Sequence, residues 1–417
     1  MSAFSPDLLA ELRARFAHVE ECPFTGPRVF FENAGGALTL KSVAETSARF
    51  AAIPDNQGRD NPASAELMRV IATARADMMR LLNAPGGQIV VGESGTEMLF
   101  RMIRTACMAA PGGGQVLGST LEHPASRSAA AHWAGHAGLA HVLVPHDDAT
   151  GTVGPDAYRA ALTPDTRVAT IVHTSPVTGM SVDIAGVAAA IREVAPDCMI
   201  VVDGIQHAAH GAIDLADAGV DGYAISPYKM FSRHGYGVAW LSDRLAALPH
   251  ECLVGGPAEQ WELGTRDTGA YATLSDVVAY LDWLGGQVSD ETEPRARLEA
   301  AARAIHAHER ALTDAMLFGA DNLPGLAAME RVRIVGGADN PAREGLVSFW
   351  VEGRPSAEVV SALGAEGIRV HIRKDDHYSG NILRPLGQND CVRVSLCHYN
   401  SPAEVARFLS AMQSIAA

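Results

Sequence analysis

Residues 221–237 read DGYAISPYKMFSRHGYG, a short apolar run followed by a lysine and a glycine-containing tail. The run from Gly222 to Ser226 has the length and composition of a buried strand. Lys229 is therefore predicted to lie just beyond the carboxyl end of that strand, with little access to bulk water. A lysine placed there either extends its ammonium group to the surface or uses a partly desolvated amine for chemistry. The other residues that reach the same point decide between these two roles.

Length and composition limit which classes of protein this sequence can belong to. The 417 residues suffice for two domains, and 47% apolar with 19% charged residues is typical of globular chains. A formal charge of -15 argues against nucleic-acid binding, and no apolar run is long enough to span a membrane. The N-terminal MSAFSPDLLAELRARF is amphipathic and carries acidic residues, unlike a secretory signal or transit peptide. The six cysteines show no metal-ligand spacing. We therefore expect a cytoplasmic protein with reduced thiols that binds neither nucleic acid nor membrane.

From about residue 88 onward, short β-branched runs alternate with helical stretches. The runs are QIVVGES, QVLGST, HVLVP, RVATIVH, MIVVDG, GYAIS and GVAWLSD, and alanine-rich amphipathic segments separate most of them. This alternation predicts an α/β domain with a mostly parallel sheet covered by helices on both faces. GYAIS and GVAWLSD are joined by a short loop, so this last pair can be antiparallel.

The pattern changes after residue 268. A long helix is predicted at roughly residues 294–317, followed by RVRIV, LVSFWVEG, a helix SAEVVSALGAEG, RVHIR, VRVSL and a last helix PAEVARFLSAMQS. This order predicts a small C-terminal α+β domain. We expect an N-terminal segment 1–30 that packs with the small domain, a large domain 31–275 and a small domain 276–417.

Polar residues collect at the predicted carboxyl ends of the strands, where doubly wound sheets bind their ligands. They are Ser94, Gly95, Thr96, His123, Ser175, Asp203, Gln206, Ser226 and Lys229. The strand-to-helix turn GESGTE suits a phosphate, and a buried Asp203 suits a protonated ring nitrogen. The Lys229 amine can form a Schiff base with an aldehyde. Phosphate, pyridinium and aldehyde together describe pyridoxal 5′-phosphate. Each feature alone has an ordinary structural explanation, such as a helix cap or a solvated lysine.

Three other functions compete with this interpretation. A dinucleotide oxidoreductase needs G-x-G-x-x-G after the first strand, and that motif is missing. A binding protein without cofactor would have lost Lys229 or Asp203, which are both present. A metal hydrolase could use His207 and His210, but two histidines at this spacing without a third ligand are usually surface or cap residues.

The chain resembles the class V aminotransferases, a fold-type I group that includes cysteine desulfurases and isopenicillin N epimerase. The segments that carry this resemblance are FFENAGG, GESGTEML, LEHPAS, VVDGIQHAAHGAIDLADAGVDGYAISPYKMF, WELGT and VRVSLCHYNSPAEV. The resemblance covers nearly the whole chain and is strongest to the cysteine-desulfurase-like branch. It implies a mostly parallel seven-stranded sheet with helices on both faces, a small α+β domain, and a homodimer with shared active sites.

The resemblance also assigns roles to individual residues. It makes Lys229 the cofactor-bearing lysine and proton shuttle, Asp203 the partner of the pyridine nitrogen and Gln206 that of the ring hydroxyl. His123 resembles the residue stacked on the ring, and Ser94, Gly95, Thr96 and Ser226 resemble the phosphate-binding residues. Thr265 resembles the residue that reaches the phosphate of a partner subunit. Arg393 resembles the arginine that binds the substrate carboxylate, and Asn33, Ala34, Gly35 and Arg59 match segments that line the substrate end. No metal ligands are implied.

The chain departs from the family pattern at three places. Ser175-Pro176 stands where the family commonly has a serine followed by an asparagine, and Tyr228 stands where many desulfurases have histidine. The loop cysteine that accepts sulfur in desulfurases is absent, because the matching segment VHIRKDDHYSGNILRPLG contains none. Cys391 and Cys397 are expected to be packing residues. Arg373, Lys374, His377 and Arg384 instead place charges where the resemblance puts the substrate gate.

We therefore expect an enzyme that acts on the α-amino group of a small amino acid with a polar or acidic distal group. Aminotransferase-type chemistry is the first expectation. The alternative on the same scaffold is a β-eliminating C–S lyase, desulfurase-like or epimerase reaction, because the fate of the Cα proton depends on a few side chains at the substrate end.

Overall fold

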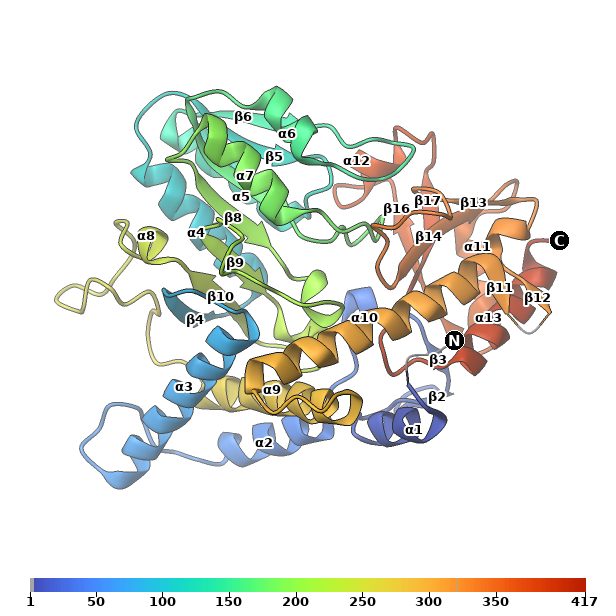
Figure 1. The fold of residues 1–417 in the computed structure, drawn as a ribbon, viewed down its shortest axis with the longest axis horizontal. Helices are drawn as coiled ribbons and strands as arrows, with labels where there is room; N and C mark the ends of the chain where they lie inside the picture. The colour runs from blue at the N-terminus through green and yellow to red at the C-terminus, as the bar shows by residue number, and fades with distance from the viewer. Residues whose placement is uncertain (1–3, 321) are drawn as a thin grey trace.

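The computed structural model describes residues 4–320 and 322–417, which form a large lobe and a small lobe (Figure 1). The large lobe contains a seven-stranded sheet. Its spatial order is β4 (Gln88–Gly92), β10 (Gly237–Leu241), β9 (Gly222–Ile225), β8 (Met199–Asp203), β7 (Thr166–Val172), β5 (Gln115–Ser119) and β6 (Ala140–Val144). All neighbours are parallel except β10, which runs antiparallel to both β4 and β9. The predicted mostly parallel sheet and its antiparallel last pair are confirmed.

The central strands read as continuous apolar runs because both faces of the sheet are covered. On one face, Val90, Val116 and Val201 pack against α4 (Gly95–Ala109) and α5 (Pro124–Ala137). On the other face, side chains such as Ile89 and Ile200 pack with α3 (Pro62–Leu81), α7 (Ile184–Val194) and α9 (Thr268–Val288). Successive residues of one strand thus enter different cores, as the alternation of side chains along a strand requires.

The small lobe contains a four-stranded antiparallel sheet with its own apolar core. Its order is β13 (Val332–Ile334), β14 (Leu346–Val351), β17 (Asp390–Ser395) and β16 (His371–Lys374), with α11 (Ser356–Ala365) and α13 (Pro402–Ile415) packed in the same lobe. The order of strands and helices expected from the sequence is present. A short helix α12 (Gly380–Leu383) follows β16 in the segment where the sequence predicted a gate.

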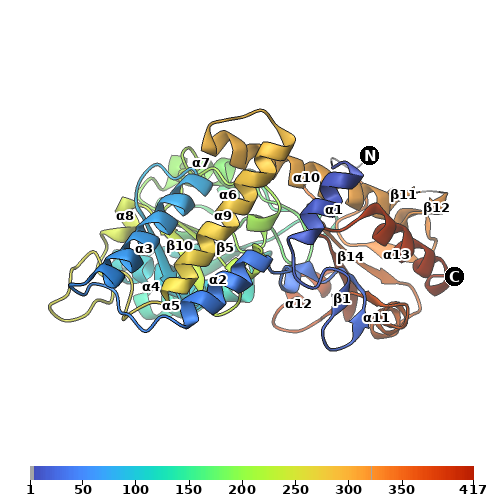
Figure 2. The same cartoon turned by 90° about the horizontal axis from the view of Figure 1, so that it is seen from below.

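The N-terminal segment contacts the small lobe. Helix α1 (Pro6–Ala14) begins after Ser5, whose hydroxyl accepts a hydrogen bond from the Leu8 amide, and it lies beside the small lobe in Figure 2. The Arg13 guanidinium donates to the Tyr399 carbonyl at 2.6 Å. Strand β3 (Val29–Phe30) pairs in parallel with β15 (Ile368–Arg369). A short hairpin of β1 (Glu21–Cys22) and β2 (Gly26–Pro27) lies between α1 and β3 in the chain.

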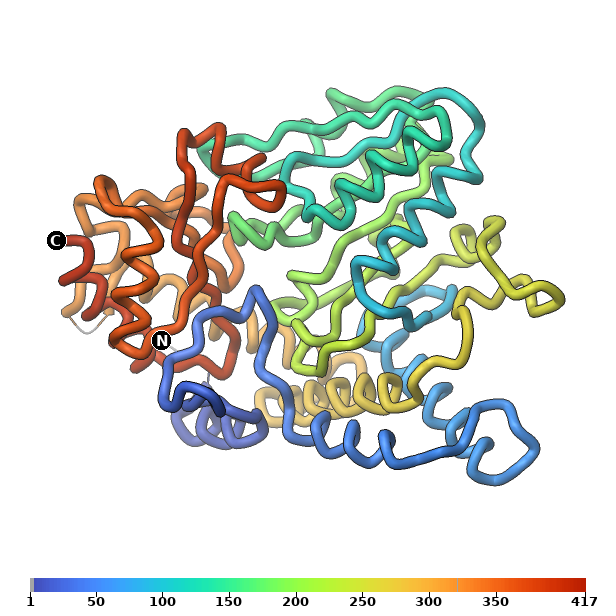
Figure 3. Tube along the Cα trace, turned by 180° about the vertical axis from the view of Figure 1, so that it is seen from behind, coloured from blue at the N-terminus to red at the C-terminus, as the bar shows by residue number. Residues whose placement is uncertain are grey.

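Helix α10 (Pro294–Phe318) joins the two lobes and matches the long helix predicted near residues 294–317. It packs against α9 and reaches α13 in the small lobe (Figures 1 and 3). Helix α9 continues through residue 275 without a break, so the domain boundaries set out above remain predictions. The remaining elements are α2 (Lys41–Ala51), α6 (Pro155–Ala161), α8 (Asp243–Ala246), β11 (Gly319–Ala320) and β12 (Leu323–Pro324). Within the described residues, none of the helices is both long and apolar enough to cross a bilayer.

Candidate active site

A cavity of about 160 Å³ lies where the carboxyl ends of β7, β8 and β9 meet the small lobe. The crossover topology places these three neighbouring strand ends at one edge of the sheet, as expected for a parallel α/β fold. The residues proposed from the sequence that line this cavity are Ala34, Gly35, Thr96, His123, Asp203, Gln206, Ser226, Lys229 and Arg393. The large lobe supplies most of these groups, and β17 supplies Arg393.

Lys229 ends a 3-10 turn directly after β9, and only 7% of its surface is exposed. Its Nζ atom donates a hydrogen bond to Gln206 Oε1 at 3.2 Å. Burial, followed by the charge of Arg393, lowers the pKa of Lys229, whereas Asp203 opposes the shift. The amine is thus more easily deprotonated than that of a surface lysine, which suits a group that bonds to an aldehyde and moves protons.

Asp203 is the last residue of β8, and 4% of its surface is exposed. One carboxylate oxygen, Oδ1, accepts a hydrogen bond from the Ile205 amide at 3.1 Å. Burial raises the pKa of Asp203, while the Ile205 amide and Lys229 lower it. A buried carboxylate that faces a cavity is stabilised by a cation bound there.

The first turn of α4 forms one end of the cavity, where Thr96 and Ser226 line the wall. Gly95 lies so close to this wall that a Cβ atom on it would sit 2.4 Å from Ser226 Oγ. The hydroxyl of Ser94 caps the helix by accepting from the Glu97 amide at 3.1 Å and does not line the cavity. The free amides and positive end of α4 can bind an anion here, together with the two hydroxyl groups.

His123 caps α5, and its Nδ1 atom accepts from the Ala125 amide at 3.0 Å. Burial, followed by the charge of Lys229, lowers the pKa of His123 to about 3, so the ring is neutral and can stack on a flat ligand. Tyr378 packs edge-on against this ring with a centroid distance of 4.7 Å. Tyr378 comes from the segment after β16 and was not singled out in the sequence, because nothing local marks it as a cavity residue.

Two arginines from the small lobe line the cavity. The Arg393 side chain is 3% exposed, donates to the Pro176 carbonyl at 2.9 Å, and leaves its Nε atom without a hydrogen-bond partner. Arg373 donates to Ser379 Oγ at 2.8 Å, and its guanidinium lies 3.6 Å from the centre of the Tyr378 ring. Of the four charged residues that the sequence placed at the gate, only Arg373 lines the cavity, whereas Lys374, His377 and Arg384 are exposed.

Besides residues at the start of α4, the proposed residues Asn33, Arg59 and Thr265 also lie outside the cavity wall. The Asn33 amide is buried and bonded to Ser395 O and Asn400 Oδ1, so it ties the N-terminal segment to β17. Thr265 and Arg59 are exposed. Thr265 lies in a separate surface hollow with Asp55 and Gln57, just before Arg59 in the chain.

The expectation that His207 and His210 are surface residues is wrong, although His210 does cap the short 3-10 turn His207–Ala209. His207 is 7% exposed and His210 is 4% exposed, and each forms a buried contact with a glutamate. Glu344 and Glu309, the two partners, lie more than ninety residues further along the chain, so no local pattern connects them to the histidines. Cys391 and Cys397 are buried, as expected for packing residues.

The cavity residues fit pyridoxal 5′-phosphate in three respects. A buried carboxylate, Asp203, faces the cavity and can pair with a protonated ring nitrogen. A helix N-terminus with two hydroxyl groups can hold a phosphate, and Lys229 presents an amine of lowered pKa to an aldehyde.

Comparisons with known proteins agree with this geometry. The sequence model of the family described as "Aminotransferase class-V" matches residues 29–293 and 294–408. The chain is 27% identical to an "Aminotransferase-like protein" of Gibberella zeae over 99% of both chains. It is 26% identical to a "Probable cysteine desulfurase" of Xylella fastidiosa, with 99% of this chain and 96% of that protein covered. The crystal structure of the cysteine desulfurase CsdA from Escherichia coli superimposes with a TM-score of 0.78 and 24% identity, covering 97% of this chain and 98% of that one.

Proposed function

The chain belongs to the class V aminotransferase family and is a pyridoxal-phosphate-dependent enzyme, and we propose that it transfers the amino group of a small amino acid with an acidic distal group. The observation that carries this proposal is the pair of guanidinium groups in the cavity. Among the described residues, neither Arg393 nor Arg373 forms an ion pair with a carboxylate, and their hydrogen bonds go to the Pro176 carbonyl and the Ser379 hydroxyl. Two such cations beside Lys229 suit a ligand that carries two anionic groups.

Each residue of the cavity has a separate role in the proposed reaction. Bound pyridoxal phosphate supplies an electron sink for the pair left behind when a proton leaves Cα. Arg393 binds the α-carboxylate through its planar guanidinium, and Arg373 binds the distal anion. Lys229 would remove the Cα proton and return it to the carbon of the cofactor's aldehyde group, while Asp203 would hold a proton on the ring nitrogen. Tyr378 covers the His123 side of the cavity and excludes water from it.

Transamination suits this arrangement because the amino acid and the 2-oxo acid acceptor carry the same pair of anionic groups. One cavity with two guanidinium groups can therefore accept both in turn. The likeness to cysteine desulfurases favours a second candidate, β-elimination of an anionic leaving group that Arg373 would stabilise. Transfer of persulfide sulfur is not part of either candidate, because none of the described residues that line the cavity is a cysteine.

Arg373→Gln is expected to lower kcat/KM for an acidic amino acid by about 10²-fold, since a hydrogen bond to a charged group contributes roughly 1.5–3 kcal/mol. The kcat/KM for a neutral amino acid of similar size should change little. Lys374→Gln is the matched control, because Lys374 is the adjacent charge and is exposed. A parallel loss for acidic and neutral substrates in the Arg373 variant would contradict the proposed contact.

Product analysis separates the two reactions. Incubation of the loaded enzyme with L-aspartate, L-glutamate and L-cysteine sulfinate should give a 2-oxo acid and a stoichiometric amount of the aminated cofactor. Ammonia with an unsaturated product or pyruvate would decide for elimination instead. A persulfide on any cysteine after incubation with L-cysteine would contradict both candidates.

We also propose a cytoplasmic homodimer whose active sites are shared. Six free cysteines without a disulfide fit a reducing compartment. Thr265 and Arg59 are exposed and lie outside the Lys229 cavity, so they are free to reach the cavity of a second copy of the chain. Light scattering should therefore give twice the mass of the 43.9 kDa chain.

Mixing two weakened variants tests the shared sites directly. A mixture of Lys229→Ala and Thr265→Ala proteins that exchange subunits should recover roughly a quarter of wild-type activity. Half of the randomly assorted dimers contain one subunit of each variant, and each of these dimers has one complete site out of two. Lys229→Ala mixed with Asp203→Asn is the control, since both residues line the same cavity and no complete site arises. Equal activities in the two mixtures would rule out sharing of the site.

A further inference from the structure

The segment that follows β16 determines where the Arg373 side chain points. We refer to this segment, residues 375–388, as the gate segment. The backbone of Arg373 is fixed in β16, opposite Cys391 of β17. Its side chain is held by two gate residues: Nε donates to Ser379 Oγ at 2.8 Å, and the guanidinium lies 3.6 Å from the centre of the Tyr378 ring. Because a free arginine side chain has many rotamers, these two contacts select the one that lines the cavity.

The gate segment has a defined shape of its own. One carboxylate oxygen of Asp376, Oδ1, accepts hydrogen bonds from the amides of Tyr378 at 2.8 Å and Ser379 at 3.1 Å. An ion pair of 2.6 Å between Arg384 Nε and Asp375 Oδ1 joins the residue after α12 to the first residue of the gate segment. Tyr378 and Ser379 are thus tied to the rest of the segment, and their positions depend on where the segment docks.

Two side-chain contacts dock the gate segment on the large lobe. The Arg127 guanidinium, in the first turn of α5, donates to the His377 carbonyl. The Asn381 amide, in α12, donates to the Thr120 carbonyl. Both contacts lie at the connection between β5 and α5, which also carries His123. Each contact has a backbone carbonyl at one end, so it restrains the main chain rather than only a flexible side chain.

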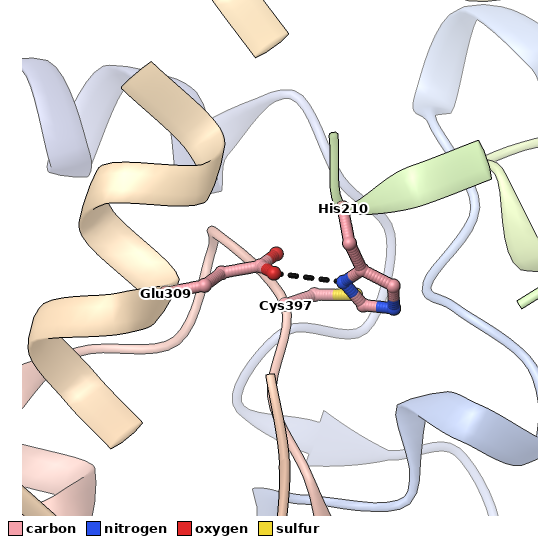
Figure 4. A group of neighbouring side chains, drawn as sticks. All are labelled: His210, Glu309 and Cys397. Carbon is pink, nitrogen blue, oxygen red and sulfur yellow. Dashed lines mark hydrogen bonds and ion pairs between the residues drawn. The ribbon is translucent and has the colours of Figure 1, made fainter. Parts of the chain in front are cut away.

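The two lobes are also joined at other places, which lie outside the gate segment. Glu309 of α10 lies beside Cys397, and its Oε2 atom is 2.7 Å from Nδ1 of His210 (Figure 4). Glu344 forms a second buried contact, at 2.7 Å, with Nδ1 of His207. Loss of the two docking contacts would therefore release the gate segment without separating the lobes.

We propose that Arg127 and Asn381 are positioning residues that set the selectivity for a distal anion through Arg373. Within the described part of the chain, neither of them lines the cavity. By docking the gate segment they place Ser379 and Tyr378, which hold the Arg373 guanidinium ready for an anion. A substrate then loses less free energy in ordering that side chain when it binds. The inference rests on the proposed function, in which Arg373 binds the distal anion.

Amide hydrogen exchange of the gate segment tests the docking without any substrate. Arg127→Met keeps much of the length of the side chain but removes its donors, and Asn381→Leu keeps the approximate volume of the amide. Each variant should speed exchange in a peptide that covers residues 375–388 by about fivefold, the equivalent of one hydrogen bond. Arg127→Lys keeps a donor and should retain part of the protection. Unchanged exchange in both Arg127→Met and Asn381→Leu would overturn the proposal.

L-Aspartate and L-asparagine, which have nearly the same shape but differ in the charge of the distal group, test the effect on selectivity. In Arg127→Met and Asn381→Leu, KM for L-aspartate should rise about tenfold, whereas kcat for L-aspartate and both constants for L-asparagine should stay near the wild-type values. In an Arg373→Gln background, Arg127→Met should cause no further loss, because its effect passes through Arg373. Faster exchange with an unchanged KM, or an equal further loss in that background, would overturn the path through Arg373.

Arg244→Met is the matched control for the loss of an arginine that bonds to backbone carbonyls. Arg244 donates to the carbonyls of Asp197 at 2.7 Å and Cys198 at 2.9 Å, just before β8 and outside the cavity. Exchange in the gate segment and the preference for L-aspartate should both stay at the wild-type values. If Arg373→Gln itself left that preference unchanged, the proposed function would fail together with the effect on selectivity, whereas the exchange measurement decides the docking by itself.

Discussion

Replacement of Lys229 by alanine is expected to abolish turnover and to remove the visible absorbance of the lysine-bound cofactor. Among the described residues Lys229 is the only lysine that lines the cavity, and burial lowers its pKa, so its amine is the one placed for covalent attachment. Loss of both the attachment and the proton shuttle should lower kcat by at least about 10⁴-fold, as removal of other covalent catalysts does. The cofactor phosphate can still bind at the start of α4, so weak non-covalent binding should remain.

The composition of the chain makes this experiment unusually clear. The sequence contains only three lysines, Lys41, Lys229 and Lys374. Borohydride reduction of the wild-type enzyme should therefore give one labelled peptide, which contains Lys229. Lys374→Ala is the matched control and should keep both absorbance and turnover, because Lys374 is exposed outside the cavity. A labelled lysine in the reduced Lys229→Ala protein would assign the attachment to another residue.

Asp203→Asn is expected to keep the cofactor attached but to lower kcat by about 10³-fold, roughly 4 kcal/mol. The carboxylate is buried at the end of β8, where its negative charge can hold a proton on the ring nitrogen. A neutral amide of the same shape cannot do this, so the electron pair left at Cα loses its stabilisation. The rate of Cα proton exchange with solvent deuterium measures this step directly.

Asp221→Asn provides the matched control for a buried aspartate. Asp221 is 3% exposed and bonds to the Ile200 amide and Arg192, outside the cavity. This variant should lose stability while Cα proton exchange in the remaining folded protein stays near the wild-type rate. Wild-type exchange in the Asp203 variant would show that the ring-nitrogen role is wrong.

The large lobe could be predicted from the sequence because its signals are local. Continuous apolar runs separated by amphipathic helices leave few alternatives to a parallel sheet covered on both faces. In such a sheet the strand ends meet at one edge, so Asp203, Ser226 and Lys229 could be placed together before any coordinates were known. The family resemblance then supplied Arg393 in the small lobe, where strand periodicity alone gives no reason to expect a cavity residue.

The tertiary structure decided what depends on contacts between distant segments. Arg373 and Lys374 are adjacent and equally charged, yet only Arg373 lines the cavity. Successive side chains of β16 point to opposite faces of the sheet, and the packing of the two lobes decides which face meets the cavity. His207 and His210 look like solvent-exposed residues in the sequence, but Glu344 and Glu309 bury them from the small-lobe side and from α10. Local sequence determines which side chains a segment carries. The partners that meet them are set by the docking of the two lobes, which joins residues separated by more than ninety positions.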